Sequence, residues 1–531
     1  MTQPEGPSSL DPMAMSARAD AAAPPSFAVP PSSFAAPVIT VRDSSPGDIP
    51  AMVALAREGQ KAWGDLPISA RVRALSKVKN RLLSRADEIA AVLQAETGKP
   101  LEEGLLAEVI PNADLVDYWT HTGQDLLAPS EISLDALSFP GKSGMVYREA
   151  RGVIALITPW NFPVAIPLRS LLPALLAGNA VVFKPSEVTP RSGALVASLF
   201  DGLLPHGVLS VAQGAGDVGA ALVAADVDLV VFTGSVRTGK RIALACAERL
   251  VPCSLELGGK DAAIVLADAN LERAARGIVW GAFTNAGQNC ASIERVYVES
   301  AIADRFLARV AELTRELRPG LDVGPLTTRA QRDIVVSHLK QAIAGGAEVL
   351  AGGLPEGDDL FVPPTVLRVH DERTPLIADE TFGPVLPVMV VASADEGIAR
   401  ANDSRYGLTA SLWTSHHAHG EALARKLRAG VVTINNHAFT GAIPSAPWTG
   451  VGESGHGITN GPHALSELTR PRLVLVDANR AKAELWWYPY TPALRQVAQA
   501  MAKLRGGAGF FGRIGALFSL LAAFPKRLLG G

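Results

Sequence analysis

The stretch Leu229-Val230-Val231-Phe232-Thr233-Gly234-Ser235 decides the fold that this sequence predicts. Its first four residues form an apolar run typical of a buried strand, and a stretch with helical spacing begins near Gly239. A strand, a tight glycine turn and the N-terminus of a helix direct backbone N–H groups toward a pyrophosphate. The pattern therefore predicts a phosphate site formed by Thr233, Gly234, Ser235 and Gly239, although glycine turns are also common where no ligand binds.

Apolar runs of the same kind recur on both sides of this stretch, and segments with helical spacing separate them. The runs lie at residues 153–157, 180–183, 209–211 and 262–265, and the helical segments at 168–176, 191–203, 218–225 and 239–250. Strands that alternate with helices predict a doubly wound parallel sheet. A second alternating stretch, residues 261–433, predicts a second α/β domain.

The composition limits the classes of protein to consider. The 531 residues carry a formal net charge of −3, which gives no reason to expect nucleic acid as a partner. Three cysteines are too few for a disulfide framework, which favours a reducing cytoplasm. No metal-ligand spacing occurs, and we predict no metal. Residues 1–36, rich in Pro, Ala and Ser, predict a disordered leader rather than a secretory signal.

Three segments carry candidate chemistry. Cys290 follows Asn285-Ala286-Gly287-Gln288-Asn289, and a lone cysteine among small and amide residues suits a nucleophile on a turn. An unperturbed thiol has a pKa of about 8.5, so Cys290 needs a base. Glu256, followed by Leu257-Gly258-Gly259, suits a base at a strand end. The amide of Asn161, between Pro159 and Pro163, suits a preorganised donor to an oxyanion, and a plain turn residue is the alternative interpretation.

Together with Phe232-Thr233-Gly234-Ser235 and Glu380-Thr381-Phe382-Gly383-Pro384, these segments resemble the motifs of the aldehyde dehydrogenase superfamily. They occur in the family's order, and the resemblance extends from about Ile39 to Val476. It implies an α/β fold with a Rossmann-like dinucleotide-binding domain (residues 37–136 and 151–258) and a second α/β catalytic domain (residues 259–447). It also implies a small β oligomerisation projection (residues 137–150 and 468–478) that pairs subunits in a homodimer or homotetramer. The alternative is that the projection's strands are plain connectors.

The resemblance assigns catalytic roles. Cys290 would attack an aldehyde, Asn161 and the Cys290 N–H would hold the oxyanion, and Glu256 would activate first the thiol and then water. The predicted reaction is oxidation of an aldehyde to its carboxylic acid with NAD or NADP, through a thiohemiacetal and a thioester. Two alternatives stay open. Transfer of the acyl group to coenzyme A is disfavoured by Glu256, which acylating relatives commonly lack, and the other alternative is an inactive relative with a binding or structural role.

The resemblance also assigns the cofactor site. Glu380 would bind the nicotinamide ribose, Phe382 would pack against the nicotinamide ring, and Trp160 would lie beside the cofactor. Lys184 and Glu187, at the end of another apolar run, would bind the adenosine ribose. A carboxylate at Glu187 would repel a 2′-phosphate, which favours NAD, while NADP remains an alternative.

The substrate is less clearly indicated. Arg169 matches one of the carboxylate-binding arginines of succinate-semialdehyde dehydrogenases, but Thr284 stands where their second arginine would be. We therefore expect an aliphatic or aromatic aldehyde, with a carboxylated semialdehyde as the alternative. The chain also departs from the family at Ser170, where lysine is common, and at Pro462, where many members carry a glutamate. Both positions have been linked with proton relay, so these two departures leave the route of proton exit open.

The C-terminal extension, residues 479–531, lies beyond the resemblance. From Thr491 onward it contains six basic residues and no acidic ones, and residues 514–524 are strongly apolar. Basic and apolar residues together suit an interfacial helix on an anionic membrane. The alternative is a tail that docks on the enzyme's own surface or on a sister subunit, for which Trp486-Trp487-Tyr488-Pro489-Tyr490 is well suited.

Overall fold

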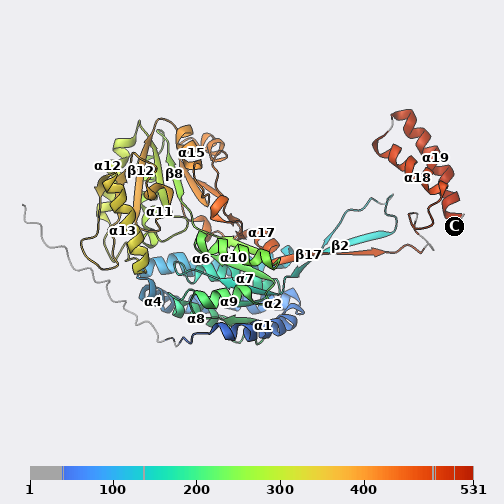
Figure 1. The fold of residues 1–531 in the computed structure, drawn as a ribbon, viewed down its shortest axis with the longest axis horizontal. Coiled ribbons are helices and arrows are strands. Elements are labelled where there is room, and N and C mark those ends of the chain that lie inside the picture. Colours follow the sequence, from blue (N-terminus) through green and yellow to red (C-terminus); the bar gives the residue numbers. More distant parts are fainter. Residues whose placement is uncertain are drawn as a thin grey trace, which may run out of the picture. The chain divides into compact units, whose positions relative to one another are not determined.

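The computed structural model describes Ile39 and residues 41–135, 138–480, 484, 486–507 and 509–529. The predicted leader, residues 1–36, lies outside the described residues. The chain divides into two units, drawn in Figure 1. The first contains the described residues up to Ala128 together with Arg148–Arg470, and the second contains Pro129–Tyr147 and the described residues from Pro471 onward.

The first unit contains the predicted doubly wound parallel sheet, which is confirmed. Its strand order is β5-β4-β3-β6-β7, and every neighbouring pair is parallel. The strands are β3 (Val153–Ile157), β4 (Ala180–Lys184), β5 (Leu209–Val211), β6 (Leu229–Thr233) and β7 (Cys253–Glu256). The intervening helices are α7 (Ala165–Leu176), α8 (Pro190–Ser198), α9 (Gly216–Ala224) and α10 (Val236–Glu248).

Both faces of this sheet are covered, which explains why its strands are apolar throughout rather than alternating. Ile154 and Leu156 of β3 pack with α7, α8 and the N-terminal helices α2 (Ile68–Leu75), α3 (Lys77–Ser84), α4 (Ala86–Thr97) and α6 (Ile110–Leu126). Val153 and Ala155, which point the other way, pack with α1 (Ile49–Gly64), α9 and α10. Successive strand residues therefore enter two different hydrophobic cores.

A second sheet in the same unit has the order β10-β11-β12-β9-β8-β13-β14, with only β10 antiparallel to its neighbour. Its strands are β8 (Asp261–Val265), β9 (Ile293–Glu299), β10 (Glu348–Ala351), β11 (Thr365–Arg368), β12 (Val385–Val391), β13 (Thr409–Trp413) and β14 (Val431–Ile434). Its helices are α11 (Leu271–Phe283), α12 (Ala303–Glu316), α13 (Arg329–Ala344), α14 (Pro375–Ala378), α15 (Ala394–Asn402) and α16 (His417–Ala424). Only Leu257-Gly258-Gly259-Lys260 separates β7 from β8, so the proposed boundary between the two domains falls within this short connection.

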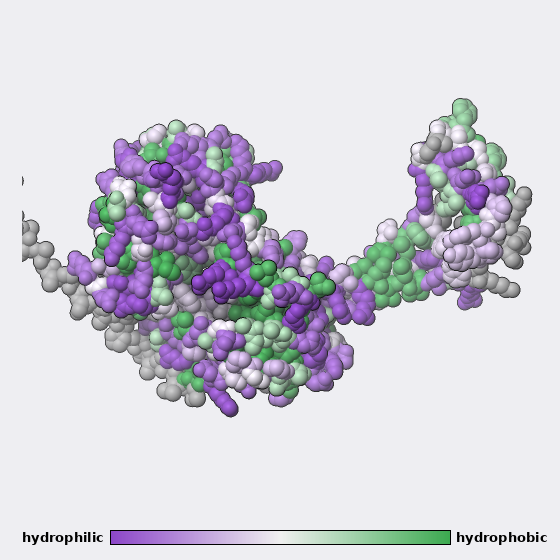
Figure 2. Space-filling model, in the orientation of Figure 1, coloured by the Kyte–Doolittle hydropathy of each residue, from purple (hydrophilic) through white to green (hydrophobic). Residues whose placement is uncertain are grey.

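The second unit includes most of a three-stranded sheet, β1-β2-β17, and a pair of helices. The predicted strands at 143–148 and 472–476 lie within β2 (Lys142–Ala150) and β17 (Thr469–Asp477), and β1 is Ser130–Glu131. In β17 the apolar side chains Leu473, Val474, Leu475 and Val476 are all exposed. Figure 2 shows the corresponding apolar surface, in green, over these strands. The helices are α18 (Pro492–Ala502) and α19 (Phe510–Leu529).

Candidate active site

Cys290 lies where two cavities of the first unit meet. One, the turn cavity, has a volume of about 270 Å³, and the other, the apolar cavity, has a volume of about 250 Å³. Cys290 lines both cavities. The turn cavity is also lined by predicted site residues from four other segments, namely Trp160, Asn161, Thr233, Gly234, Ser235, Glu256, Glu380 and Phe382. The fold therefore brings together motifs that are up to 222 residues apart (160 to 382).

The turn cavity lies at the point where the order of the first sheet reverses. The chain passes from β3 outward to β4 and β5, and then returns to the other side of β3 to form β6 and β7. The loop after β3 contains Trp160 and Asn161, and the glycine turn follows β6. In open parallel sheets, ligands bind at the carboxyl ends of the strands at such a reversal. The Ser235 side chain caps α10 by accepting from the Thr238 N–H, which leaves a helix N-terminus directed toward this crevice.

The nucleophile is held on a tight turn between α11 and β9. Asn285 and Ala286 both have left-handed backbone conformations, with φ near 53°. Gly287 is also left-handed (φ 69°), and a Cβ there would lie 2.2 Å from the carbonyl oxygen of Gly383. Glycine is therefore required, because the nucleophile loop packs directly on the loop that carries Phe382. The Cys290 Sγ is 3.8 Å from the Asn289 Oδ1.

The electrostatic surroundings leave Cys290 protonated at neutral pH. Burial raises the pKa of this thiol to about 12, and the carboxylates of Glu256 and Asp261 raise it as well, whereas Arg169 opposes them. A thiol in this environment needs a base as it attacks. Burial also raises the pKa of Glu256, again opposed by Arg169, so that its proton affinity moves toward that needed for base catalysis near neutral pH. Its Oε1 is buried without a hydrogen-bond partner among the described residues, and is free to accept from water or from the thiol.

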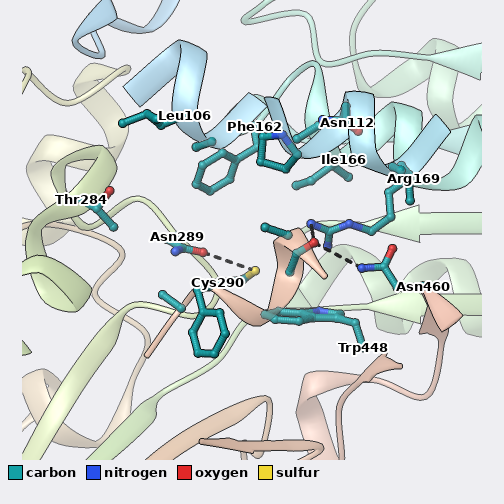
Figure 3. A pocket seen from close by; sticks show the side chains of 18 of the residues that line it. Leu106, Asn112, Phe162, Ile166, Arg169, Thr284, Asn289, Cys290, Trp448 and Asn460 are labelled. Carbon is teal, nitrogen blue, oxygen red and sulfur yellow. Dashed lines mark hydrogen bonds between the residues drawn. The ribbon is translucent and has the colours of Figure 1, made fainter. Parts of the chain in front are cut away.

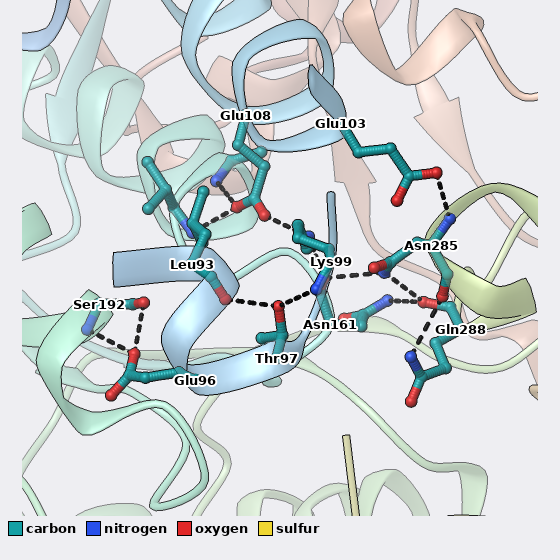
Figure 4. A network of polar contacts seen from close by, with 12 residues as sticks. Leu93, Glu96, Thr97, Lys99, Glu103, Glu108, Asn161, Ser192, Asn285 and Gln288 are labelled. Atoms are coloured by element: carbon teal, nitrogen blue, oxygen red, sulfur yellow. Dashed lines mark hydrogen bonds and ion pairs between the residues drawn. The ribbon is translucent and has the colours of Figure 1, made fainter. Parts of the chain in front are cut away.

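A buried polar network holds Asn161 beside the nucleophile loop (Figure 4). The Asn161 Nδ2 donates to the Gln288 carbonyl oxygen (3.1 Å), and the Asn285 Nδ2 donates to the Asn161 carbonyl oxygen (3.0 Å). The Lys99 Nζ donates to that same Asn161 oxygen (2.9 Å) and forms an ion pair with Glu108. An amide has two N–H bonds, so Asn161 keeps one that is available to an oxyanion.

Sequence reasoning missed Lys99 and Glu108, although both side chains are almost completely buried (1% and 0% exposed). The second Glu108 oxygen accepts from the N–H groups of Val164 (2.8 Å) and Ala165 (3.2 Å), where α7 begins. The pair therefore secures both ends of the segment that follows Asn161. A charged residue in an otherwise apolar stretch (Leu105-Leu106-Ala107-Glu108-Val109-Ile110) was the signal that could have identified Glu108.

Glu380 and Phe382 face the same cavity from the other side. The Gly259 N–H donates to the Glu380 Oε1 (3.2 Å), and a Cβ at Gly258 would lie 2.2 Å from the Glu380 Oε2. Burial raises the pKa of Glu380 to about 8, and the nearby Glu294 raises it as well. The Phe382 ring meets Trp160 edge-to-face, with the ring centroids 5.7 Å apart.

A second buried ion pair, also missed from the sequence, fixes the Phe382 loop. Glu294 accepts from the N–H groups of Thr381 (2.7 Å) and Phe382 (2.8 Å), and its charge is matched by Lys260. Lys260 follows the two glycines after Glu256. The same short connection between the two sheets therefore supports the candidate base and the loop that carries Phe382.

The other predicted cofactor residues lie outside the lining of the turn cavity. Lys184 ends β4, is buried, and its Nζ lies 3.2 Å from the Glu187 Oε2. The Glu187 side chain is about half exposed (52%). Gly239 is in α10, where a Cβ would lie 2.4 Å from the Leu257 Cδ2, so this glycine permits close packing of the helix on the connection that follows β7. Of the predicted cofactor residues, only these three do not line that cavity.

The apolar cavity is lined mainly by side chains such as Leu106, Leu115, Phe162, Ile166, Phe439 and Trp448. Arg169 and Asn460 lie at one side of it (Figure 3), and both donate to the Gly441 carbonyl oxygen, at 3.0 Å and 3.2 Å. The Arg169 guanidinium lies 5.7 Å from the centre of the Trp448 ring. No carboxylate of the described residues lies within salt-bridge distance of it, although Glu256 is near enough for Arg169 to lower the pKa of that carboxyl.

The structure also places the three residues at which the sequence departs from the family's motifs. Thr284 lines the apolar cavity, and its hydroxyl donates to Glu103 (3.0 Å). Ser170 is buried in α7, and Pro462 is in the first turn of α17 (Gly461–Leu468), a position that proline favours. Among the described residues, no group of three His, Cys, Asp or Glu side chains could hold a metal ion.

Comparisons with known proteins agree with this geometry. Residues 26–474 match the model of the aldehyde dehydrogenase family. A 4,4'-diapolycopene aldehyde oxidase of Methylomonas is 38% identical over 453 residues, which is 84% of this chain and 85% of that protein. A Mycobacterium tuberculosis protein with the provisional name succinate-semialdehyde dehydrogenase (NADP) 2 is 36% identical over 450 residues, or 82% of this chain and 86% of its own length.

Solved structures are similar over the same region. The structure of PnpE in complex with nicotinamide adenine dinucleotide has a TM-score of 0.80 and 35% identity, covering 84% of this chain and 92% of that one. An NAD+ complex of an aldehyde dehydrogenase from Bacillus cereus has a TM-score of 0.79 and 32% identity, covering 82% and 90%.

Proposed function

Because this chain belongs to the aldehyde dehydrogenase family, it oxidises aldehydes, and we propose that Cys290, Glu256 and Asn161 are its catalytic residues. The observation that carries the proposal is the position of Cys290, which lines both the turn cavity and the apolar cavity. A nucleophile in that place meets an aldehyde from one side and a dinucleotide from the other. None of the other predicted site residues lines both cavities.

The first step is addition of the Cys290 sulfur to the aldehyde carbon as Glu256 takes the thiol proton. The carbonyl oxygen becomes an oxyanion, which the free N–H of the Asn161 amide and the Cys290 backbone N–H stabilise. The Lys99 and Asn285 contacts hold the Asn161 backbone in position for this role. NAD, when bound, supplies the acceptor for the hydride that leaves the former aldehyde carbon, and Cys290 is left as a thioester.

Hydrolysis of that thioester is the second task of Glu256. Once Glu256 has released to solvent the proton that it took from the thiol, a water molecule that donates to the unpartnered Oε1 would be deprotonated as it attacks the thioester carbon. The carboxylic acid is then released, and Glu256 returns the proton to the Cys290 sulfur. The raised pKa of Glu256 makes it a stronger base than an ordinary carboxylate. This supports the hydrolytic reaction over acyl transfer to coenzyme A, which has no need of such a base.

We propose NAD rather than NADP as the preferred cofactor. The residues present fit a dinucleotide, since the glycine turn, Glu380 and Phe382 surround one cavity at the reversal of the sheet. Lys184 and Glu187 would bind the adenosine ribose at the end of β4. The half-exposed Glu187 carboxylate would repel a 2′-phosphate, although Lys184 beside it reduces that repulsion.

For the substrate we propose an aldehyde with an extended apolar body. The side chains that line the apolar cavity give such a molecule favourable contacts over most of its surface. The similarity to a 4,4'-diapolycopene aldehyde oxidase supports this class, since its named substrate is an apolar aldehyde. Medium-chain and long-chain aliphatic or aromatic aldehydes are therefore the compounds to try first.

A carboxylated semialdehyde is the second candidate, and Arg169 is the observation that favours it. Its guanidinium lines the apolar cavity without a carboxylate partner among the described residues, so a substrate carboxylate could pair with it. Arg169→Met tests this directly. If Arg169 binds the substrate, kcat/KM for succinate semialdehyde falls by about 10-fold to 100-fold more than that for hexanal, which changes only through the higher pKa of Cys290 and Glu256.

We further propose that subunits pair through β2 and β17, as the family resemblance implies, in a homodimer or homotetramer. The four exposed apolar residues of β17 support this, because an exposed apolar strand favours association. The three cysteines are free thiols, which supports a reducing cytoplasmic location. Among the described residues, no helix is both long enough and apolar enough to cross a membrane.

The deciding experiment measures NADH formation from a medium-chain aldehyde in the absence of coenzyme A, with wild-type enzyme and with Cys290→Ala. Steady NADH production by the wild type and none by the variant, with NAD binding retained, supports the mechanism. An unchanged rate in Cys290→Ala would refute it. Steady turnover only after coenzyme A is added would assign the acylating reaction instead.

A further inference from the structure

One face of α19 is apolar and exposed along several turns. Its six members are Phe510, Phe511, Ile514, Leu517, Phe518 and Leu521, and between 39% and 85% of each is exposed. At about 100° per residue, these positions fall within one broad stripe of the helix. We call them the α19 face. An exposed apolar stripe of this kind is rare on a monomeric protein and marks a surface that binds another protein or a membrane.

The opposite side of α19 already has a partner. Ala516 and Ala523 are buried (3% and 1% exposed), and so are Val497 and Ala500 of α18. α18 and α19 are in contact, so they form a hairpin, and these four residues are the buried ones among those described. The two helices therefore bury one side of α19 against α18 and leave the α19 face exposed.

The charge of the hairpin complements an anionic surface. From Thr491 onward the chain carries six basic residues and no acidic ones. Arg495 and Lys503 of the hairpin are exposed, and Arg505 lies 3.7 Å from Asp135 in the same unit. Trp487, which precedes the hairpin, is also exposed (53%), and such aromatic side chains favour the headgroup region of a membrane.

We propose that the α18–α19 hairpin binds the surface of an anionic lipid bilayer, with the α19 face inserted among the acyl chains. The six phenylalanine, leucine and isoleucine side chains would be buried at the boundary of headgroups and chains, while the basic residues attract anionic lipid. The helix lies in the plane of the interface, since no described helix can span the bilayer. If the proposed apolar substrate is correct, the aldehyde reaches the enzyme from the same bilayer.

The test uses the full-length enzyme and co-sedimentation with vesicles. Vesicles of phosphatidylglycerol and phosphatidylcholine are compared with vesicles of phosphatidylcholine alone, at low and at high salt. We expect binding to the anionic vesicles that weakens at high salt, because the Debye length falls from about 10 Å at 0.1 M to about 3 Å at 1 M. No sedimentation with either vesicle overturns the proposal.

Two variants test whether the α19 face itself inserts into the membrane. Each substitution in them adds one carboxylate. Phe511→Glu combined with Phe518→Glu places two carboxylates on it, and we expect the vesicle partition coefficient to fall by about 100-fold or more. Ser519→Glu adds a carboxylate to the same helix but outside the stripe, and should keep most of the binding. A loss per added carboxylate that is as large in Ser519→Glu as in the double variant would mean that charge alone binds the vesicle, which overturns the insertion of this face.

Two further readouts separate this proposal from its rivals. Both variants should oxidise a water-soluble aldehyde at the wild-type rate, whereas oxidation of a vesicle-dissolved long-chain aldehyde should fall only in the double variant. Absence of turnover with every aldehyde, with sedimentation intact, would contradict the proposed function and leave membrane binding standing. A change of oligomeric mass in the double variant, without loss of sedimentation, would assign the face to a second copy of the chain and overturn the proposal.

Discussion

Lys99→Met is the substitution that most directly tests how the oxyanion loop is held. It removes the ammonium group that pairs with Glu108 and donates to the Asn161 carbonyl oxygen, and it keeps a long apolar stem in the same space. Removing one partner of a buried ion pair costs about 3–5 kcal/mol. Glu108 keeps two backbone donors, at 2.8 Å and 3.2 Å, so we expect the lower end of that range.

Catalysis should fall as well, because the Asn161 backbone keeps only the Asn285 donor. Loss of an oxyanion donor outright costs about 100-fold to 1,000-fold in kcat, and a displaced donor should cost less, about 10-fold. The free energy of unfolding is measured by urea denaturation, and kcat by NADH formation. KM for NAD should stay near its wild-type value, since Lys99 does not line the turn cavity.

The matched control is Lys79→Met, which makes the same chemical change in a partly exposed ion pair with Asp117. Such a pair contributes about 0–1 kcal/mol, so this variant should be nearly as stable and as active as the wild type. The double variant Lys99→Met with Glu108→Gln should lose less stability than the two single variants added together, because it leaves no unpaired buried charge. A normal kcat in Lys99→Met, with stability reduced as expected, would show that the pair supports the fold without positioning Asn161.

The other predictions concern the candidate base and the cofactor. Glu256→Gln should slow the first release of NADH, because the thiol loses its base, and turnover should stop after about one NADH per subunit; steady turnover would argue against its role in hydrolysis. Since burial raises the pKa of Glu256 and the base acts when ionised, wild-type kcat should fall with decreasing pH through a midpoint above 4.5. Gly258→Ala places a Cβ 2.2 Å from the Glu380 Oε2, so KM for NAD should rise by about 10-fold while NAD-independent thiol reactivity persists. Glu187→Ser should raise kcat/KM for NADP by about fivefold, and no change would remove the basis for preferring NAD.

Periodicity predicted the parallel sheet correctly because both of its faces are buried. Residues 153–157 and 229–232 are apolar at every position, and the structure accounts for this by placing alternate side chains in two different cores. The sequence could not predict the order β5-β4-β3-β6-β7, since strand order depends on which helix covers which face. That order creates the reversal at which the glycine turn and the Asn161 loop meet.

The proposed catalytic residues lie in recognisable local sequence patterns, whereas the buried charged residues that hold their loops in place do not. Cys290, Glu256 and Asn161 were proposed from their neighbours along the chain. Lys99 and Glu294 have no such neighbours, because each acts on backbone groups between 62 and 88 residues away. Buried ion pairs of this kind become visible only after folding brings the charge and its partner together.

By itself the sequence determined the reaction class, since the chemistry needs a thiol, a carboxylate and an amide in segments whose local composition is recognisable. Tertiary structure alone decided that Cys290 lies between two cavities and that the α19 face points outward. It also decided that Arg169, which forms no salt bridge among the described residues, faces the apolar cavity. The physical reason is that backbone conformation and residue type are local, whereas the pKa of a buried group, the walls of a cavity and the exposure of a helix face depend on residues distant in sequence.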